Sequence, residues 1–496
     1  MQKSVFFSLL IFLFVACSPG NIPSSPTAAA VTPEVLPQPS FTPAPLPTEP
    51  PTPPAPTAPQ RAQYTFFVTL DDAARSVDVE QTILYPNRSG KTLDNLVLAV
   101  VPNLWPNCFY LTSMSIDGVP VANYSLLGQR LELSLPVPLA PESAVLLSLE
   151  YRLSLPFAAQ ADPSQERPRI FGYTGRQLNL NNWYPFVTPF INGEWVLHDP
   201  WYYGEHLVYE AADYTVYFKV TDPEAGLVVA ASGWSEPQEA WMRYTLTAGR
   251  AFAFSISPQF EVASVQVGDV TVYSYYFPVM EAHRKGGKDV LDVTAQALEL
   301  FSQRFGPYPH RTLSAVMGDF NDGMEYSAFF FMPRDFYNAS ADSPKNYLTF
   351  VAAHETAHQW WFEAVANDQA LEPWLDESLC NYSERLYYET YFPDLTAWWW
   401  PYRMYYYNAQ AKLDISIYEG GGFQPYTNAT YFRGAHFLED LRTRIGDEAF
   451  FAFLRDYRLQ YDGRIASSSD FFAVLRQHTD ADFSDLLQAY FRNPNR

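Results

Sequence analysis

Short runs of alternating apolar and polar residues fill the chain from Tyr64 to about Phe260. They include YTFFVTL at 64–70, SVDVEQTILY at 76–85, RLELSLPVPL at 130–139 and AVLLSLEYRLSL at 144–155, and Pro, Gly and Asn residues separate them. A period of two is typical of strands with one buried face, and no helical period of any length intervenes. The pattern therefore predicts an all-β domain of the sandwich type over residues 62–267.

The pattern becomes helical beyond this point. Residues 289–305, DVLDVTAQALELFSQRF, carry apolar residues at helical spacing and end before Gly306 and Pro307, as a helix does. Residues 313–320 predict one more strand, and most of the chain from there to residue 496 predicts helices. We therefore expect a multidomain α+β protein, in which an α/β domain over residues 268–496 follows the β domain.

The amino end, residues 1–17, has a short basic start at Lys3 and an apolar run too short to span a bilayer. Its last residues, Phe14 to Cys17, resemble the lipobox of bacterial lipoprotein signals. The resemblance implies a lipid anchor on Cys17 and a position outside the cytoplasm on a bacterial membrane. An ordinary secretion signal is the alternative.

Residues 18–61 are rich in Pro, Thr, Ser and Ala and nearly lack large apolar residues, so we expect a disordered tether there. The formal charge of −22 argues against nucleic acid as a partner. Cys108 and Cys380 are far apart in sequence and are expected to be free, buried thiols.

The segment that carries chemistry is 350–362, FVAAHETAHQWWF, in which His354, Glu355 and His358 form a His-Glu-x-x-His pattern. Residues four apart share a helix face, so both imidazoles can point to one place. The flanking residues are those of a buried helix, where polar side chains need partners, and a divalent cation meets that need. The alternative is a helix that carries two histidines by chance.

Glu377 lies 18 residues beyond His358, in a second predicted helix. Two imidazoles and one carboxylate leave one position of a tetrahedral Zn²⁺ ion open, as in catalytic zinc sites, so we expect one zinc ion here. Glu355 is displaced around the helix from the two histidines and can take a proton from water at the metal.

The sequence HETAHQWW, followed by WLDES, resembles the zinc aminopeptidases of the M1 (gluzincin) family, in a form without the large C-terminal helical domain of longer members. The resemblance implies a saddle-like β domain, a thermolysin-like catalytic domain and peptide substrates. It also implies zinc ligation by His354, His358 and Glu377, with Glu355 as general base.

Residues 323–325, Gly-Met-Glu, resemble part of the family motif G-x-M-E-N. The resemblance implies that Glu325 binds the free α-amine of the substrate and that Gly323 and Met324 line the bound peptide. Asp322, Gly323 and Tyr326 stand where the family has Gly, Ala and Asn. These departures leave open a zinc endopeptidase or another zinc hydrolase.

Two further residues are expected near the metal. Residues 431–435, YFRGA, resemble the family motif Y-x-K-G-A, which implies that the Tyr431 hydroxyl stabilises the oxyanion, with Tyr426 as the alternative. Glu384 lies seven residues beyond Glu377 on the same helical face, so it is a candidate partner for the ring N–H of a ligating histidine. An exposed carboxylate is the other interpretation of Glu384.

The sequence thus predicts a membrane-tethered, extracytoplasmic zinc aminopeptidase. Two other functions stay open at this point. One is a zinc endopeptidase or another zinc hydrolase with the same metal centre, and the other is a surface binding protein that holds zinc without catalysis.

Overall fold

The strands and helices below come from a computed structural model, which describes residues 60–158, 170–338, 343–404 and 410–494. All of them belong to one unit, Pro56–Arg496. The predicted signal with Cys17, and all but the last two residues of the predicted tether, lie outside the described residues. Among the helices of the described part, none combines the length and the apolar character that a bilayer crossing requires.

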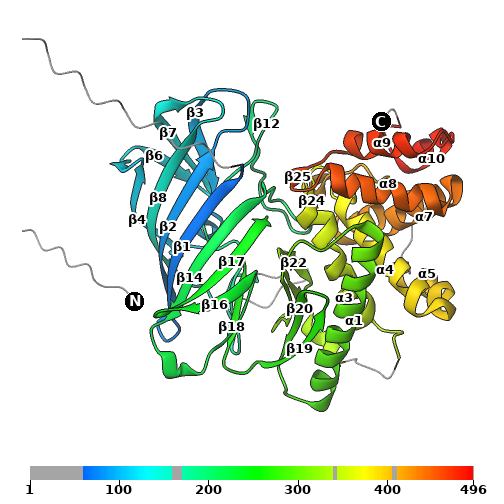
Figure 1. The fold of residues 1–496 in the computed structure, drawn as a ribbon, viewed down its shortest axis with the longest axis horizontal. Helices are drawn as coiled ribbons and strands as arrows, with labels where there is room; N and C mark the ends of the chain where they lie inside the picture. The colour runs from blue at the N-terminus through cyan, green and yellow to red at the C-terminus, as the bar shows by residue number, and fades with distance from the viewer. Residues whose placement is uncertain (1–59, 159–169, 339–342, 405–409, 495–496) are drawn as a thin grey trace, which may run out of the picture. The chain divides into compact units, whose positions relative to one another are not determined.

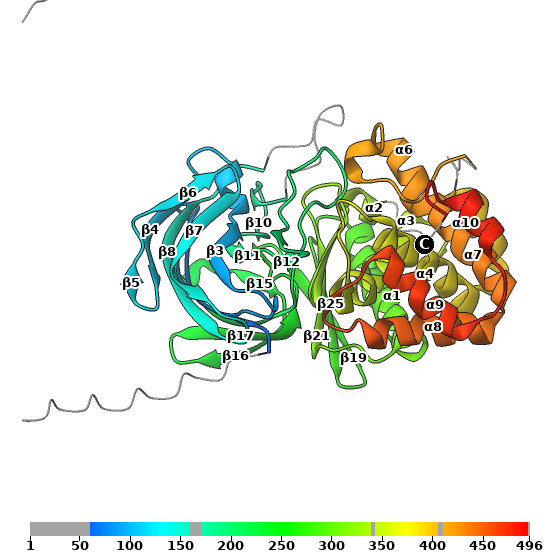
Figure 2. The ribbon, with the colours of Figure 1, turned by 90° about the horizontal axis from the view of Figure 1, so that it is seen from above.

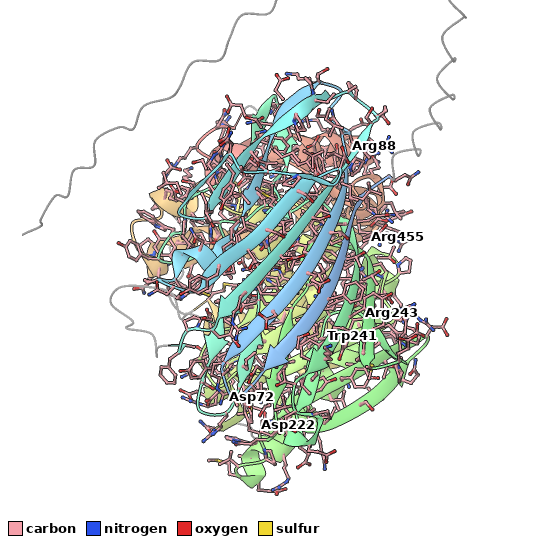
Figure 3. The ribbon with its side chains drawn as sticks, turned by 90° about the vertical axis from the view of Figure 1, so that its left-hand side faces the viewer. Asp72, Arg88, Asp222, Trp241, Arg243 and Arg455 are labelled. Atoms are coloured by element: carbon pink, nitrogen blue, oxygen red, sulfur yellow. The ribbon has the colours of Figure 1, made fainter. Side chains whose placement is uncertain are left out.

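The first half of the chain builds an eight-stranded sheet, whose long strands run side by side in Figure 1. In sheet order the strands are β16 (Trp234–Gln238), β17 (Trp241–Gly249), β14 (Ala212–Val220), β1 (Ala62–Asp71), β2 (Ser76–Pro86), β8 (Ala144–Ser154), β4 (Phe109–Ile116) and β5 (Val119–Pro120). Within this sheet, β1 and β14 are parallel, and all other neighbouring strands are antiparallel. Figure 3 looks onto one face of this sheet, with Trp241 and Arg243 of β17 labelled.

The period of two seen in the sequence reflects one buried face of this sheet. In β1, Phe66 is fully buried whereas its neighbour Phe67 is exposed. The ring of Phe66 lies 5.0 Å from those of Trp183 and Tyr184 in an aromatic core. Two four-stranded sheets complete the region: β15 (Val228–Ala231), β18 (Phe254–Ser257), β10 (Leu178–Leu180) and β9 (Gly172–Tyr173); and β11 (Phe186–Val187), β3 (Leu93–Ala99), β7 (Arg130–Leu139) and β6 (Tyr124–Leu127).

A further, five-stranded sheet begins the carboxyl-terminal region. Its order is β19 (Glu261–Val267), β20 (Val270–Tyr276), β21 (Thr312–Met317), β23 (Phe329–Met332) and β22 (Met324–Tyr326). Because β19 and β20 form a hairpin, the predicted domain boundary between residues 267 and 268 falls inside that hairpin. Strand β22 is an edge strand and carries Glu325.

Helices make up most of the rest of the carboxyl-terminal region, and Figure 2 shows α1, α4, α7, α8 and α9 gathered together. Their bounds are α1 (Glu281–Phe305), α2 (Arg334–Asn338), α3 (Tyr347–Ala357), α4 (Trp374–Tyr391), α5 (Thr396–Arg403), α6 (Phe423–Thr427), α7 (Gly434–Ile445), α8 (Asp447–Gln460), α9 (Ser468–His478) and α10 (Ser484–Tyr490). The start of α3 is capped by Asn346, whose side chain accepts a hydrogen bond from Thr349 N at 2.8 Å.

Arg250, from the end of β17, joins the β region to the helices. Its buried guanidinium donates hydrogen bonds to the carbonyls of Tyr209 at 3.1 Å, Glu363 at 2.9 Å, Ala364 at 3.2 Å and Arg464 at 2.9 Å. Glu363 and Ala364 belong to the irregular π-helical turn η3 (Gln359–Ala364) that follows α3. These bonds hold the end of the metal-site helix against the β region.

Candidate metal centre and substrate cleft

Helix α3 presents His354 and His358 on one face. Both side chains are buried, and their Nε2 atoms lie 3.2 Å apart. Two nitrogens bound at 2.0–2.1 Å to one tetrahedral ion lie about 3.4 Å apart. The separation of the two imidazoles is therefore the one expected of ligands that share an ion.

Helix α4 brings Glu377 to the same point. Its Oε2 atom lies 3.3 Å from His354 Nε2 and 3.9 Å from His358 Nε2. The potential ligand atoms of these three residues all lie within 4.8 Å of one another. Glu325, Glu355 and His358 form a second such group, but it shares His358 with the first.

Glu384 fixes the tautomer of His354. Glu384 lies two turns beyond Glu377 on α4. Its Oε1 atom lies 2.9 Å from Nδ1 of His354, the ring nitrogen that does not face the metal position. Because a carboxylate can only accept here, Nδ1 carries the proton, and Nε2 keeps its lone pair for a cation. Glu384 is fully buried, so it is the ring partner and not an exposed carboxylate.

The electrostatics of the site call for a cation. Burial disfavours a charged His354, but Glu377 and Glu384 outweigh burial and raise the pKa of His354 to about 10. Burial and the charge on His354 lower the pKa of His358 well below its ordinary value. Without a metal ion, His354 and His358 together therefore hold one extra proton, which supplies the positive charge of the site. The donor set, two imidazoles and one carboxylate with a carboxylate behind one ring, fits zinc.

The carboxylate of Glu355 lies beside Gly323, in the loop before β22, and one of its oxygens is within 4.8 Å of a ring nitrogen of His358. Its Oε2 atom is buried with no hydrogen-bond partner among the described residues. Burial raises the pKa of Glu355 to about 8, and His354 opposes that shift. Burial therefore increases the proton affinity of this carboxylate, and proton affinity is the property that a general base uses.

These residues lie in a cleft of about 1580 Å³ that opens between the β region and the helices. The residues that line it and are used below are Glu205, Gly323, Glu325, Phe350, His354, Glu355, His358, Glu377, Arg403, Tyr426, Tyr431 and Phe432. The volume exceeds that of ordinary small-molecule pockets, about 300–1,000 Å³. An extended peptide of several residues fits such a space.

Glu325 and Glu205 add negative charge beside the metal position. Glu325 is buried, its Oε2 atom lies 4.0 Å from His358 Nε2, and its Oε1 atom accepts a hydrogen bond from Gln369 at 3.1 Å. Burial, and after it the charge of Glu205, raise the pKa of Glu325 well above its ordinary value. Carboxylates crowded in this way favour a positively charged ligand.

Tyr431 faces the metal position more directly than Tyr426. The ring of Tyr431 stacks on His354 with centroids 5.8 Å apart, whereas Tyr426 belongs to a small cluster with Tyr203 and Ile417, against which Tyr431 also packs. Burial, and then Glu377, raise the pKa of Tyr431 well above its ordinary value, so its hydroxyl stays protonated and can donate.

The side chain of Met324 has different surroundings from its neighbours Gly323 and Glu325. Because side chains alternate along a strand, Met324 and Glu325 point to opposite faces of β22. Met324 packs against the main hydrophobic core and does not line the cleft, whereas Gly323 and Glu325 do. Sequence reasoning missed Glu205, which comes from the long loop between β13 (Glu194–Trp195) and β14, where no motif marks it.

Comparison with known proteins agrees with this site. The model of the peptidase family M1 domain matches residues 290–490. Aminopeptidase M1-D of Oryza sativa is 25% identical over 221 residues, which are 41% of this chain and 25% of the relative. Aminopeptidase N of Streptomyces lividans is 23% identical over 299 residues, which are 56% of this chain and 35% of the relative. The chain thus spans between a quarter and about a third of the length of these two relatives.

Solved structures match nearly the whole chain. A mutant M1 zinc metallopeptidase of Deinococcus radiodurans, bound to a Tyr-Ser-Ala substrate, superposes with a TM-score of 0.62 at 19% identity and covers 88% of this chain and 96% of its own. The unmutated enzyme gives a TM-score of 0.59 at 20% identity, covering 85% of this chain and 91% of its own. The predicted fold class is confirmed: the chain has the two-domain fold of these M1 zinc metallopeptidases.

Proposed function

We propose that this protein is an aminopeptidase that holds one zinc ion at His354, His358 and Glu377 and removes amino-terminal residues from peptides. The observation that carries the proposal is the buried carboxylate of Glu325, 4.0 Å from the ring of His358. A peptide that places its α-ammonium group on Glu325 has its first peptide bond within reach of the metal position. The second carboxylate, Glu205, strengthens the attraction for that ammonium group.

The residues around the metal have distinct tasks in this reaction. A bound zinc ion supplies a Lewis acid that polarises the scissile carbonyl and lowers the pKa of water. Glu355 accepts the proton of the attacking water and then passes it to the leaving amine. The Tyr431 hydroxyl donates a hydrogen bond to the carbonyl oxygen as negative charge develops on it.

The crowding of carboxylates favours an aminopeptidase over an endopeptidase. An endopeptidase would set an uncharged stretch of peptide against Glu325, leaving a buried carboxylate without a counter-charge. An aminopeptidase delivers an ammonium group to the same place. The altered neighbours of Glu325, Asp322 and Tyr326, leave this carboxylate in the cleft.

Matched peptides test the assignment. The enzyme should hydrolyse Leu-Phe-Ala but not its N-acetylated form, and Glu325→Gln should raise KM for the free peptide far more than it changes zinc content. Equal cleavage of both peptides would indicate an endopeptidase. Stoichiometric zinc without cleavage of either peptide, across a panel of first residues, would indicate a protein that binds zinc without catalysis.

We further propose that the protein acts outside the cytoplasm, anchored to a bacterial membrane through lipid on Cys17. The lipobox-like end of residues 1–17 and the Pro-rich stretch 18–61 support this, since a tether is useful only when its start is anchored. Cys17→Ser should prevent incorporation of labelled palmitate and release the protein into the soluble extracytoplasmic fraction. Unchanged membrane association of this variant would contradict the proposal.

A further inference from the structure

Arg403, the last residue of α5, reaches the carboxylate behind His354. Its Nε atom lies 2.9 Å from Glu384 Oε2, and its Nη2 atom lies 3.0 Å from Glu384 Oε1. The guanidinium thus holds both oxygens of one carboxylate, the two-pronged geometry that gives the strongest and most directional ion pairs. A lysine cannot reproduce it, because an ammonium group is a single point of charge.

The guanidinium is itself held in place by aromatic rings. Its central carbon lies 5.0 Å from the ring centroid of Phe350 and 5.5 Å from that of Phe432. Phe350 is one helical turn before His354 on α3, so this ring and the metal ligand share a rigid support. Trp399, one turn before Arg403 on α5, donates its indole N–H to Glu384 Oε2 at 3.3 Å.

The charges in this chain of contacts are complementary. Glu384 is fully buried, and a buried carboxylate without a cation is strongly destabilising. The Nδ1–H group of His354 donates a hydrogen bond to Glu384, and in the zinc-loaded protein the Nε2 atom of His354 would ligate the metal. Among the described residues, Arg403 is the permanent cation that the structure pairs with Glu384.

We propose that Arg403 is a positioning residue of the metal centre: by fixing the carboxylate of Glu384, it sets the ring orientation and tautomer of His354 and so the strength of zinc binding. The inference rests on the zinc site proposed above. Without Arg403 the carboxylate of Glu384 can rotate, and this rotation removes the acceptor that holds His354 Nδ1–H in place.

The chain provides a matched control. Arg442 on α7 binds both oxygens of Glu389 on the same helix α4, at 2.8 Å and 2.9 Å, and its side chain is 11% exposed, against 13% for Arg403. Neither Arg442 nor Glu389 contacts a predicted metal ligand. Replacing Arg442 therefore removes a comparable arginine–glutamate pair from α4 and leaves the metal centre alone.

The test compares Arg403→Met with Arg442→Met as zinc-loaded, full-length proteins. The readout is the rate and extent of zinc transfer to a chromogenic chelator, with visible absorption of the Co²⁺-substituted proteins as a report on ligand geometry. Loss of an outer partner typically weakens metal binding by about 10–100-fold, and we expect a loss in this range for Arg403→Met. We expect zinc transfer from Arg442→Met to stay within about twofold of that from the unmodified protein, because a substitution at a distant, independent site has little effect on the metal centre.

Two milder variants keep the test informative if Arg403→Met folds poorly. Arg403→Lys retains the positive charge but loses the planar guanidinium that binds both carboxylate oxygens. Trp399→Phe removes one hydrogen-bond donor to Glu384 while keeping an aromatic ring. Both should shed zinc faster than the unmodified protein and more slowly than Arg403→Met, where that variant can be measured.

Several results would overturn the inference. One is zinc transfer from folded Arg403→Met or Arg403→Lys at the same rate as from the unmodified protein. Another is zinc transfer from Arg442→Met that is accelerated as much as that from Arg403→Met. A failure of the underlying zinc site looks different, because the unmodified protein itself would then bind no stoichiometric zinc.

Discussion

The carboxylate of Glu355 occupies the space next to Gly323 that a larger residue would fill. A Cβ atom added to Gly323 would lie 2.3 Å from Glu355 Oε1 and 3.2 Å from its Cδ. The clash involves the end of a flexible side chain, so the protein can fold with alanine there, but Glu355 must turn aside. In this chain, the glycine at position 323 therefore leaves room for the Glu355 carboxylate in its present position.

We therefore predict that Gly323→Ala lowers kcat while leaving stability nearly unchanged. A displacement of about 1 Å in a catalytic group can reduce the rate by roughly 100-fold, so a loss of about 10- to 100-fold is expected. Steady-state kinetics and a thermal melt measure the two effects. Gly175→Ala serves as control, because its added Cβ would meet nothing within 4 Å. An unchanged kcat in Gly323→Ala would show that Glu355 tolerates the displacement.

Tyr431→Phe should lower kcat by about 10²–10³-fold with little change in KM, because removing one oxyanion donor has an effect of that size. Tyr426→Phe should have a much smaller effect, since Tyr426 packs in the cluster with Tyr203 and Ile417. Kinetics of both variants on one aminoacyl chromogenic substrate decide between them. A larger loss of kcat in Tyr426→Phe than in Tyr431→Phe would assign the oxyanion-stabilising role to Tyr426 instead of Tyr431.

Removal of zinc should destabilise the folded protein. A ligand that binds only the folded state, present at 100 times its Kd, adds about 2.7 kcal/mol of stability. Calorimetry of the dialysed protein, before and after zinc is restored to that level, should show the midpoint rise with zinc. His358→Ala should show little rise, because one ligand is gone. An equal rise in both proteins would place the stabilising ion elsewhere.

Arg250→Met should destabilise the protein by about 3–5 kcal/mol, the usual effect of breaking a buried charge network by removing one partner. The positive charge of Arg250 interacts with the negative charge of Glu363, whose carboxylate also binds His310 at 2.7 Å. Urea unfolding followed by circular dichroism measures the change. Arg152→Met, which breaks an exposed pair with Asp78, should change stability by only about 0–1 kcal/mol. Similar changes in both variants would contradict the role given to Arg250.

Local spacing predicted much of the metal centre. His354 and His358 are one helical turn apart, and Glu384 lies two turns beyond Glu377, so their shared faces follow from helix geometry alone. The β region was equally predictable, because a sheet with one buried face imposes a period of two on its sequence.

The residues that sequence reasoning missed are those placed by tertiary contacts. Arg403 lies in a Trp- and Tyr-rich segment that suggests only packing, and its ion pair with Glu384 depends on how α5 folds back onto α4. Glu205 comes from an irregular loop without periodicity. The opposite directions of the Met324 and Glu325 side chains follow from strand alternation, which the Gly-Met-Glu motif alone does not show.

The most direct test of the account is a crystal structure of the zinc-loaded protein with anomalous diffraction recorded at the zinc absorption edge. We predict one anomalous peak, about 2.0–2.2 Å from His354 Nε2, His358 Nε2 and a carboxylate oxygen of Glu377. A peak held instead by Glu325 and Glu355, or no peak at this position, would contradict the metal centre on which the proposed reaction depends.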